Sequence, residues 1–184
     1  MKDKIIFQGK SKKGTEIIIR YPNKKDAKQM MDYINTLSKE KTFITFQGEQ
    51  VTLEEEIKHL KGFLQKIKDK KGVHLLVFSG RSLIGISNVY LGQRTQKHVG
   101  LMGISIAKNF RGEGIGRLLL KNVINEAIVN LEELEILLLG VFSNNSLAYN
   151  LYREFGFIEE GRLPKGVKLK NGYVDHIYMY KNVK

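Results

Sequence analysis

The chain has 184 residues, of which 42% are hydrophobic and 27% are charged, and its formal net charge is +12 at pH 7. This length predicts one domain over residues 1–184, and the absence of cysteine excludes disulfides, thiolate metal sites and a cysteine nucleophile. No apolar run reaches the length of a signal peptide or a membrane span, so we expect a cytoplasmic protein without a membrane partner.

The first third of the chain predicts one strand and two helices. The β-branched run EIIIR at residues 16–20 is typical of a strand, and Asn23 can cap a helix that follows it. Thr52 and Glu55 match a capping box at the start of a second helix. The segment FITFQGEQ, residues 43–50, is therefore expected to be the loop between the two helices.

The rest of the chain predicts a sheet with helices between some of its strands. The apolar runs that read as strands lie at residues 74–78, 83–91, 99–106, 136–141, 157–160 and 173–180. Residues 147–155 have the apolar periodicity of a helix, and another helix begins after residue 116. The first two of these strands form a hairpin, whereas those at 99–106 and 136–141 enclose a helix. The pattern therefore indicates an α/β fold whose sheet is mixed.

A glycine-rich loop separates the strand at 99–106 from its helix. Residues 108–120 read KNFRGEGIGRLLL, with an arginine on each side of three alternating glycines. Glycine lets the backbone turn tightly and approach a ligand, and the N–H groups that open a helix attract an anion. The spacing fits neither the dinucleotide fingerprint nor the P-loop. The loop thus favours a different phosphate compound, with a purely structural turn as the alternative.

A second pattern lies one helix and one strand further along the chain. It reads N-x-x-A-x-x-L-Y-x-x-x-G-F and is formed by Asn145, Ala148, Leu151, Tyr152, Gly156 and Phe157. Together with RGEGIG at 111–116, it resembles the GNAT N-acetyltransferase superfamily, over core motifs at residues 73–160. The layout is similar to the RimJ/RimL-like and small-amine branches. The resemblance implies the acyl-CoA N-acyltransferase fold: a mixed, mostly antiparallel central sheet with a splayed parallel strand pair and flanking helices.

The resemblance also implies a site for acetyl-CoA as cofactor, where strands 99–106 and 136–141 splay apart. The cofactor-binding residues would be Ile104, Ser105 and Ile106 through their backbone, Arg111, Gly112, Glu113, Gly114, Ile115, Gly116 and Arg117 in the loop, and Asn145 through its side-chain amide. Tyr152 would be the general acid that protonates the departing thiolate, while a strand N–H stabilises the oxyanion. The structural alternatives are a helix cap for Asn145 and core packing for Tyr152.

The general base is left open by the sequence. In the ribosomal-protein alanine acetyltransferases of the superfamily, a glutamate stands five residues before the asparagine, and Gly140 occupies that position here. Glu49, His98, Asp175 or a water chain are the alternatives. The four histidines lack the spacing of metal ligands, so we expect no metal.

The sequence thus predicts an acetyl-CoA-dependent N-acetyltransferase that acts by direct transfer in a ternary complex. Its acceptor would be a primary amine: a protein N-terminal amine, a polyamine, an amino sugar or another small amine. The loop at 43–50 and the tail at 161–178 are expected to form a wall of the acceptor site. The +12 charge supports an alternative, a nucleic-acid- or ribosome-associated binding module with this fold and little or no turnover. The oligomeric state stays open, a homodimer included.

Overall fold

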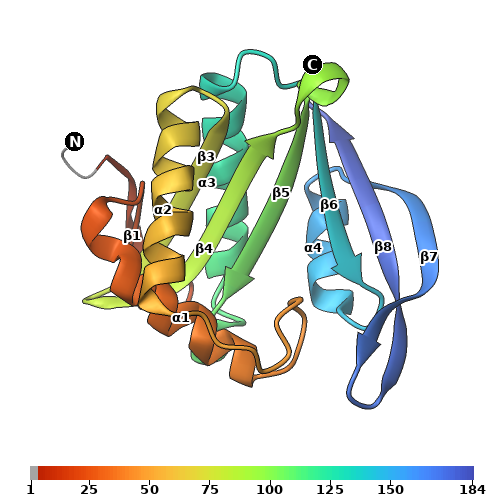
Figure 1. Cartoon of the computed structure of the whole chain (residues 1–184), viewed down its shortest axis with the longest axis horizontal. Helices are drawn as coiled ribbons and strands as arrows, with labels where there is room; N and C mark the ends of the chain where they lie inside the picture. The colour runs from red at the N-terminus through yellow and green to blue at the C-terminus, as the bar shows by residue number, and fades with distance from the viewer. Residues whose placement is uncertain (1–3) are drawn as a thin grey trace.

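A computed structural model describes residues 4–184 and shows one twisted sheet with helices on both faces (Figure 1). The elements, in chain order, are β1 (Ile5–Lys10), β2 (Glu16–Arg20), α1 (Ala27–Lys39), α2 (Leu53–Lys68), β3 (Gly72–Ser79), β4 (Ser82–Leu91), β5 (Val99–Ile106), α3 (Ile115–Asn130), β6 (Ile136–Phe142), α4 (Ser146–Glu154), β7 (Ile158–Leu169) and β8 (Gly172–Asn182). The strand order is β1-β2-β3-β4-β5-β6-β8-β7. Among the described strands, β5 and β6 alone pair in parallel. The predicted mixed, mostly antiparallel sheet is confirmed.

The helix starts follow from local hydrogen bonds. At α2, the Glu55 N–H donates to Thr52 Oγ1 (3.3 Å) and the Thr52 N–H donates to a Glu55 carboxylate oxygen (2.8 Å), which is the predicted capping box. Asn23 also caps as predicted, but it caps a short 3₁₀ turn, Lys24–Asp26. Helix α1 therefore begins at Ala27, a few residues later than the cap alone indicates.

Two strands differ from the sequence prediction. Strand β1 was not predicted, and β7 extends to Leu169 although its predicted stretch ends at residue 160. Pro164 interrupts the pattern there, within a shift of register between Leu163 and Val167. A proline is tolerated at such an irregularity of an edge strand because no ladder hydrogen bond is lost.

The core has two parts, one on each face of the sheet. Helices α1 and α2 cover one face, on which Met30 and Leu60 pack against Leu76 and Phe78 of β3 (Figure 1). Helices α3 and α4 cover the other face and form the larger cluster with the inward side chains of the strands. The order of strands thus places the β5–β6 pair beside α4 on one face, next to the α1–α2 loop on the other.

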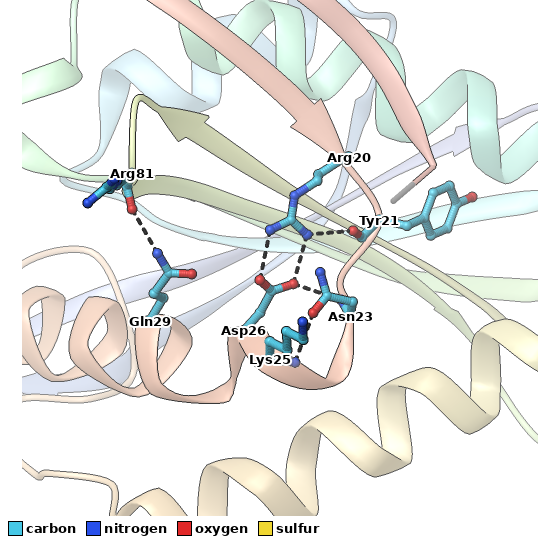
Figure 2. A network of polar contacts seen from close by, with 7 residues as sticks. All are labelled: Arg20, Tyr21, Asn23, Lys25, Asp26, Gln29 and Arg81. Atoms are coloured by element: carbon cyan, nitrogen blue, oxygen red, sulfur yellow. Dashed lines mark hydrogen bonds and ion pairs between the residues drawn. The ribbon is translucent and has the colours of Figure 1, made fainter. Parts of the chain in front are cut away.

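A polar network ties β2 to the start of α1 (Figure 2). The Arg20 guanidinium donates from Nη2 to Asp26 Oδ1 (2.7 Å) and from Nη1 to Asp26 Oδ2 (2.8 Å). The side chains of Arg20 and Asp26 are only 13% and 4% exposed, and the Asn23 N–H also donates to Asp26 (2.7 Å). A bidentate pair with this little exposure fixes the entry into α1, because removing either charge leaves the other in a dry environment.

His74 of β3 is a buried neutral side chain on the α1–α2 face. Its ring stacks on Phe63 of α2 with a centroid distance of 4.7 Å, and Nδ1 shares a hydrogen bond with the Tyr90 hydroxyl. Within residues 4–184 its Nε2 atom has no hydrogen-bond partner. Burial lowers the pKa of His74 to about 3, because the charged imidazolium loses its hydration there.

We expect this histidine to make the fold sensitive to mild acid. The histidine of the unfolded chain has a pKa near 6.5, so the stabilisation is fully present above that pH and is lost as the pH falls toward 3. The His74→Phe variant keeps an aromatic ring stacked on Phe63. When the pH is lowered from 7 to 5, the free energy of unfolding of this variant should fall by about 2 kcal/mol less than that of the wild type. Urea unfolding followed by circular dichroism at both pH values measures this difference. Equal losses in the two proteins would contradict the assignment.

Candidate active site

The central feature of the site is the point where β5 and β6 separate. Their parallel pairing covers Val99–Ile136, Gly100–Leu137 and Leu101–Leu138, and it ends there. Beyond Leu101, β5 is paired with β4, and beyond Leu138, β6 is paired with β8. The two strands diverge toward their carboxyl ends, with α4 behind the gap (Figure 1). The edges that face each other across this gap carry backbone groups that no strand pairs.

The backbone of β5 determines which groups face the gap. The Ala107 N–H donates to Ile84 O of the segment that pairs with β5 (2.9 Å). Since backbone groups alternate along a strand, those of Ser105 point toward β4 and those of Ile104 and Ile106 point toward the gap. The Ser105 side chain faces α1, where its Oγ lies 2.9 Å from the Tyr33 hydroxyl. Of the three predicted β5 residues, Ile104 therefore offers both of its backbone groups to a ligand, and Ile106 offers its N–H, since its carbonyl oxygen accepts a hydrogen bond from Arg111.

The glycine-rich loop forms the turn into α3. Gly112 and Gly114 adopt φ values of 74° and 78°, a left-handed conformation that favours glycine. In the described chain no side chain caps α3, which begins at Ile115, so its first N–H groups keep their hydrogen-bonding capacity. A Cβ atom built on Gly116 would lie 3.8 Å from Ile106 Cγ1 and 4.0 Å from Leu151 Cδ2. The loop, the end of β5 and α4 thus meet at one place.

The charged side chains of the loop are engaged by the protein. Arg111 donates to Ile106 O (2.8 Å) and to the Glu40 carboxylate (2.6 Å), and Arg117 forms an ion pair with Glu154. The Glu113 carboxylate accepts hydrogen bonds from the hydroxyls of Thr15 (2.6 Å) and Ser11 (2.9 Å), which lower its pKa. The backbone amides of the loop, more than these side chains, are therefore the groups that it presents to an anion.

The same contacts place the β1–β2 turn against the loop. The Lys12 N–H donates to Glu113 O (3.0 Å), and the Lys12 side chain packs over Gly114, 3.1 Å from the position of a Cβ there. Lys13, next along the turn, also helps to lower the pKa of the Glu113 carboxyl. The sequence prediction missed this turn, which adds positive charge beside the loop.

Asn145 is the N-cap residue of α4, and Tyr152 lies on that helix. The Asn145 Oδ1 atom caps the helix by accepting a hydrogen bond from the Ala148 N–H (3.2 Å), and its amide NH₂ makes no hydrogen bond within residues 4–184. Tyr152 is 6% exposed and packs edge-on against Phe157, with ring centroids 5.9 Å apart. Burial raises the pKa of Tyr152 to about 12. Both structural alternatives thus hold, and each side chain still keeps a polar group without a protein partner in the described chain.

The three side chains considered as general base lie in other settings. His98 precedes β5 at the closed end of the β5–β6 pair, where its carbonyl accepts hydrogen bonds from the N–H groups of Glu135 and Ile136. Asp175 binds the Lys165 N–H (3.0 Å) and lies 3.5 Å from Arg162. Glu49 is exposed in the α1–α2 loop, where it accepts the Gln47 N–H, and backbone hydrogen bonds lower its pKa. His98 thus lies at the closed end of the pair, and the carboxylates of Asp175 and Glu49 are engaged by the contacts named here.

The residue that lies over Gly140 is His176 of β8, which the sequence prediction included in the wall at 161–178 without giving it a catalytic role. A Cβ atom built on Gly140 would lie 2.3 Å from His176 Nε2. The signal in the sequence was the glycine inside the apolar run ILLLGV, because glycine within a strand often marks a close approach by another group. Its partner is 36 positions away and could not be found from spacing.

A pocket of about 440 Å³ lies beyond the carboxyl end of β6. It is lined by Lys41, Thr42 and Phe43 of the α1–α2 loop, by Asn144, and by residues 169–174 of the β7–β8 hairpin. Both segments reach the open end of the gap (Figure 1). The α1–α2 loop and the C-terminal tail thus lie opposite each other here, although the loop contributes residues just before and at the start of the predicted stretch 43–50.

Comparison with known proteins decides the family. The profile of the Acetyltransferase (GNAT) family matches residues 31–157, more than half of the chain. The chain belongs to the GNAT acetyltransferase family. This membership confirms the predictions of an N-acetyltransferase and of acetyl-CoA as its cofactor, and it confirms the predicted fold.

Two relatives share 30% of their aligned residues with the chain. The L-amino acid N-acetyltransferase AaaT of Escherichia coli aligns over 118 residues, which are 62% of this chain and 72% of that protein. The crystal structure of a GNAT acetyltransferase from Streptococcus pneumoniae superposes with a TM-score of 0.84, over 92% of this chain and all of that one. RimL, a ribosomal α-N-protein acetyltransferase in complex with coenzyme A, shares the fold at 14% identity, with a TM-score of 0.79 and 98% of both chains covered.

The described residues contain neither a membrane-spanning helix nor a cluster of metal ligands. No helix within residues 4–184 is long and apolar enough to cross a membrane. In the same range no three side chains of histidine, aspartate or glutamate gather as metal ligands would. The expectation that the protein uses no metal stays a prediction.

Proposed function

We propose that this GNAT protein transfers acetyl groups directly from acetyl-CoA to a small amine that carries a negative group. The observation that supports the proposal most strongly is the convergence of the β5–β6 gap, the uncapped start of α3 and helix α4. One continuous eight-stranded sheet also supports the prediction of a single domain over residues 1–184, of which residues 1–3 lie outside the described part.

The described residues fit acetyl-CoA. The N–H groups at residues 112–117 and the positive end of α3 suit a pyrophosphate, and the backbone groups of Ile104 and Ile106 suit the amide-containing arm of the cofactor. The free amide of Asn145 would donate a further hydrogen bond. Arg111, Glu113 and Arg117 would shape the loop through the partners they already have. When bound, acetyl-CoA supplies an activated acetyl thioester.

Tyr152 is the proposed general acid. Because its pKa is raised to about 12, the phenol stays protonated at neutral pH and has a proton to donate at Oη. Its hydroxyl has no protein partner among the described residues, so donating that proton breaks no structural hydrogen bond. The N–H groups of β5 that face the gap would stabilise negative charge on the carbonyl oxygen during transfer.

Direct transfer is supported by the side chains that the described part of the site offers. The chain has no cysteine, and the Ser105 hydroxyl is held by the Tyr33 hydroxyl on α1. A covalent acyl-enzyme needs an activated nucleophile with a base beside it, and no such pair is found at the gap within the described residues. Initial-rate patterns should therefore intersect, as for a ternary complex, and parallel lines would contradict direct transfer.

The charge of the acceptor pocket supports the substrate class. Lys41 and Lys170 line the pocket, and no carboxylate does in the described chain. Positive charge favours an amine that also carries a carboxylate, such as an amino acid, over a polycationic amine. The name of the 30%-identical relative, an L-amino acid N-acetyltransferase, agrees with this choice.

A screen of thiol release tests the acceptor. We expect kcat/KM to be at least about tenfold higher for one or more L-amino acids than for spermidine or glucosamine, because about 1.4 kcal/mol of electrostatic preference gives that ratio. N-terminal peptides with and without acidic residues form the second panel. Equal or higher values for spermidine would contradict the anionic acceptor and leave the acetyl transfer itself supported.

A further inference from the structure

The imidazole of His176 occupies the space directly above the backbone of β6. His176 lies opposite Phe142 in the β6–β8 register, and its ring leans along the strand over Gly140. The 2.3 Å between Nε2 and a built Cβ shows that a side chain at position 140 would displace this ring from its present position. The glycine and the histidine therefore act as a pair.

The position of this pair relates it to the site. Gly140 is two residues beyond Leu138, where the pairing of β6 with β5 ends. The side chains of Leu139 and Val141, on either side of Gly140, point into the α3–α4 core. Side chains alternate along a strand, so the ring over Gly140 lies on the opposite face, toward the α1–α2 loop. Tyr152 belongs to the α3–α4 core, so the Tyr152 phenol and the His176 imidazole lie on opposite faces of β6.

The surroundings of His176 leave its nitrogens available. Its ring packs against Tyr178 (centroids 4.5 Å apart) and against the edge of Phe142 (5.9 Å), and Gly166 and Leu163 of β7 lie beside its Cβ atom. Of these two ring contacts, the Tyr178 phenol is the titratable one. Asp175, the preceding residue, is occupied by the Lys165 N–H and by Arg162. Neither ring nitrogen of His176 makes a hydrogen bond within residues 4–184.

We propose that His176 is the general base of the reaction, an assignment that rests on the proposed function. A ring nitrogen takes the proton that the acceptor's ammonium must lose before its nitrogen can bond to the acetyl carbon. As the C–N bond forms and the C–S bond breaks, Tyr152 gives its proton to the sulfur. Solvent then takes the second proton of that nitrogen and the proton of the imidazolium and returns one proton to the phenolate, so the products are one amide, one free thiol and one proton released to solvent.

The test is the pH dependence of kcat/KM for the wild type, His176→Gln and the control His98→Gln. The wild type and the control should lose activity as the pH falls, because a protonated base can no longer accept a proton from the acceptor. We expect His176→Gln to be about tenfold slower at pH 7.5 and to lack that limb, with an acetyl-CoA Kd within about twofold of the wild type by calorimetry. A His176→Gln profile that matches the wild type in rate and shape would overturn the assignment.

A double variant guards against loss of structure at β8. In His176→Ala combined with Gly140→Glu, a carboxylate grows into the space that the imidazole leaves, because the atoms nearest to a Cβ at position 140 all belong to the His176 ring. Relative to His176→Ala alone, activity should rise about tenfold, and the acid limb should move toward the glutamate pKa near 4.3. No rise in a double variant that binds acetyl-CoA normally would count against a base at this position.

A binding measurement separates this assignment from the proposed function. The C2–H proton resonance of His176 is identified as the one missing from the spectrum of His176→Gln. In the wild type this resonance should shift when the best acceptor of the screen is added. A resonance that does not move would overturn contact between His176 and the acceptor. If the wild type releases no thiol with any amine of the panel, the proposed function fails and the assignment fails with it. If the wild type releases thiol and His176→Gln releases it at the same rate, the base assignment alone is overturned.

Discussion

Replacing Tyr152 by phenylalanine is expected to lower kcat about 100-fold and to leave the acetyl-CoA Kd within about twofold, because the leaving thiolate loses its proton donor. The change removes one oxygen from a ring that is 6% exposed, and the edge-on contact with Phe157 remains. No hydrogen bond to the described chain is lost with that oxygen, so the fold should be preserved. Steady-state kinetics and calorimetry on the same preparations measure the two quantities.

Tyr149→Phe is the matched control for this variant. Tyr149 lies on the same helix, and its hydroxyl donates to the Glu159 carboxylate (2.9 Å), away from the gap. Its removal should change kcat by less than about twofold, since no proton transfer is assigned to it. If Tyr152→Phe turns over as fast as the wild type, Tyr152 is not the acid and its role is packing alone.

Replacing Asp26 by alanine is expected to reduce the free energy of unfolding by about 3 kcal/mol, the lower end of the range for breaking a buried ion pair. The Asp26 carboxylate accepts hydrogen bonds from both terminal nitrogens of the Arg20 guanidinium and from the Asn23 N–H (Figure 2). Its loss leaves the Arg20 charge in a pocket where its side chain is 13% exposed, packed on the Phe78 ring. Urea unfolding of wild type and variant gives the difference.

Asp32→Ala on α1 is the control for that measurement. Asp32 pairs with Lys28, but the two side chains are 55% and 70% exposed. Exposed pairs of this kind contribute little because solvent screens them, so this variant should unfold almost as the wild type does. A loss of similar size in both variants would mean that burial does not distinguish the two pairs.

The parts of the site that the sequence predicted are those with a fixed local pattern. The glycines of the loop and the asparagine and tyrosine of α4 follow each other at set spacings, because each spacing serves one helix or turn. The capping box at Thr52 and Glu55 is local in the same way. The splay between β5 and β6 came from the family resemblance, and the register confirms it.

The parts that the sequence did not predict depend on residues far apart in the chain. Strand β1 was not predicted because its run IIFQGK lacks a clear alternation of apolar and polar residues. The turn that follows β1 binds the Glu113 carboxylate, about 100 positions later in the chain. The contact of His176 with Gly140 joins two strands that are neighbours only in the folded sheet. Such pairs are set by the strand order, which spacing along one sequence does not encode.

The central claim is that the loop before α3 holds the phosphates of acetyl-CoA. The most direct test compares the acetyl-CoA affinities of two variants of one residue in that loop. Gly112 has a φ of 74° and no heavy atom within 4 Å of a built Cβ, so the αL-tolerant residues Asn and Asp both fit there. By calorimetry we expect wild type and Gly112→Asn to bind acetyl-CoA within about threefold, and Gly112→Asp to bind at least about tenfold more weakly, because only the charge differs. Equal affinities of the two variants, or no binding by the wild type at millimolar acetyl-CoA, would contradict the claim.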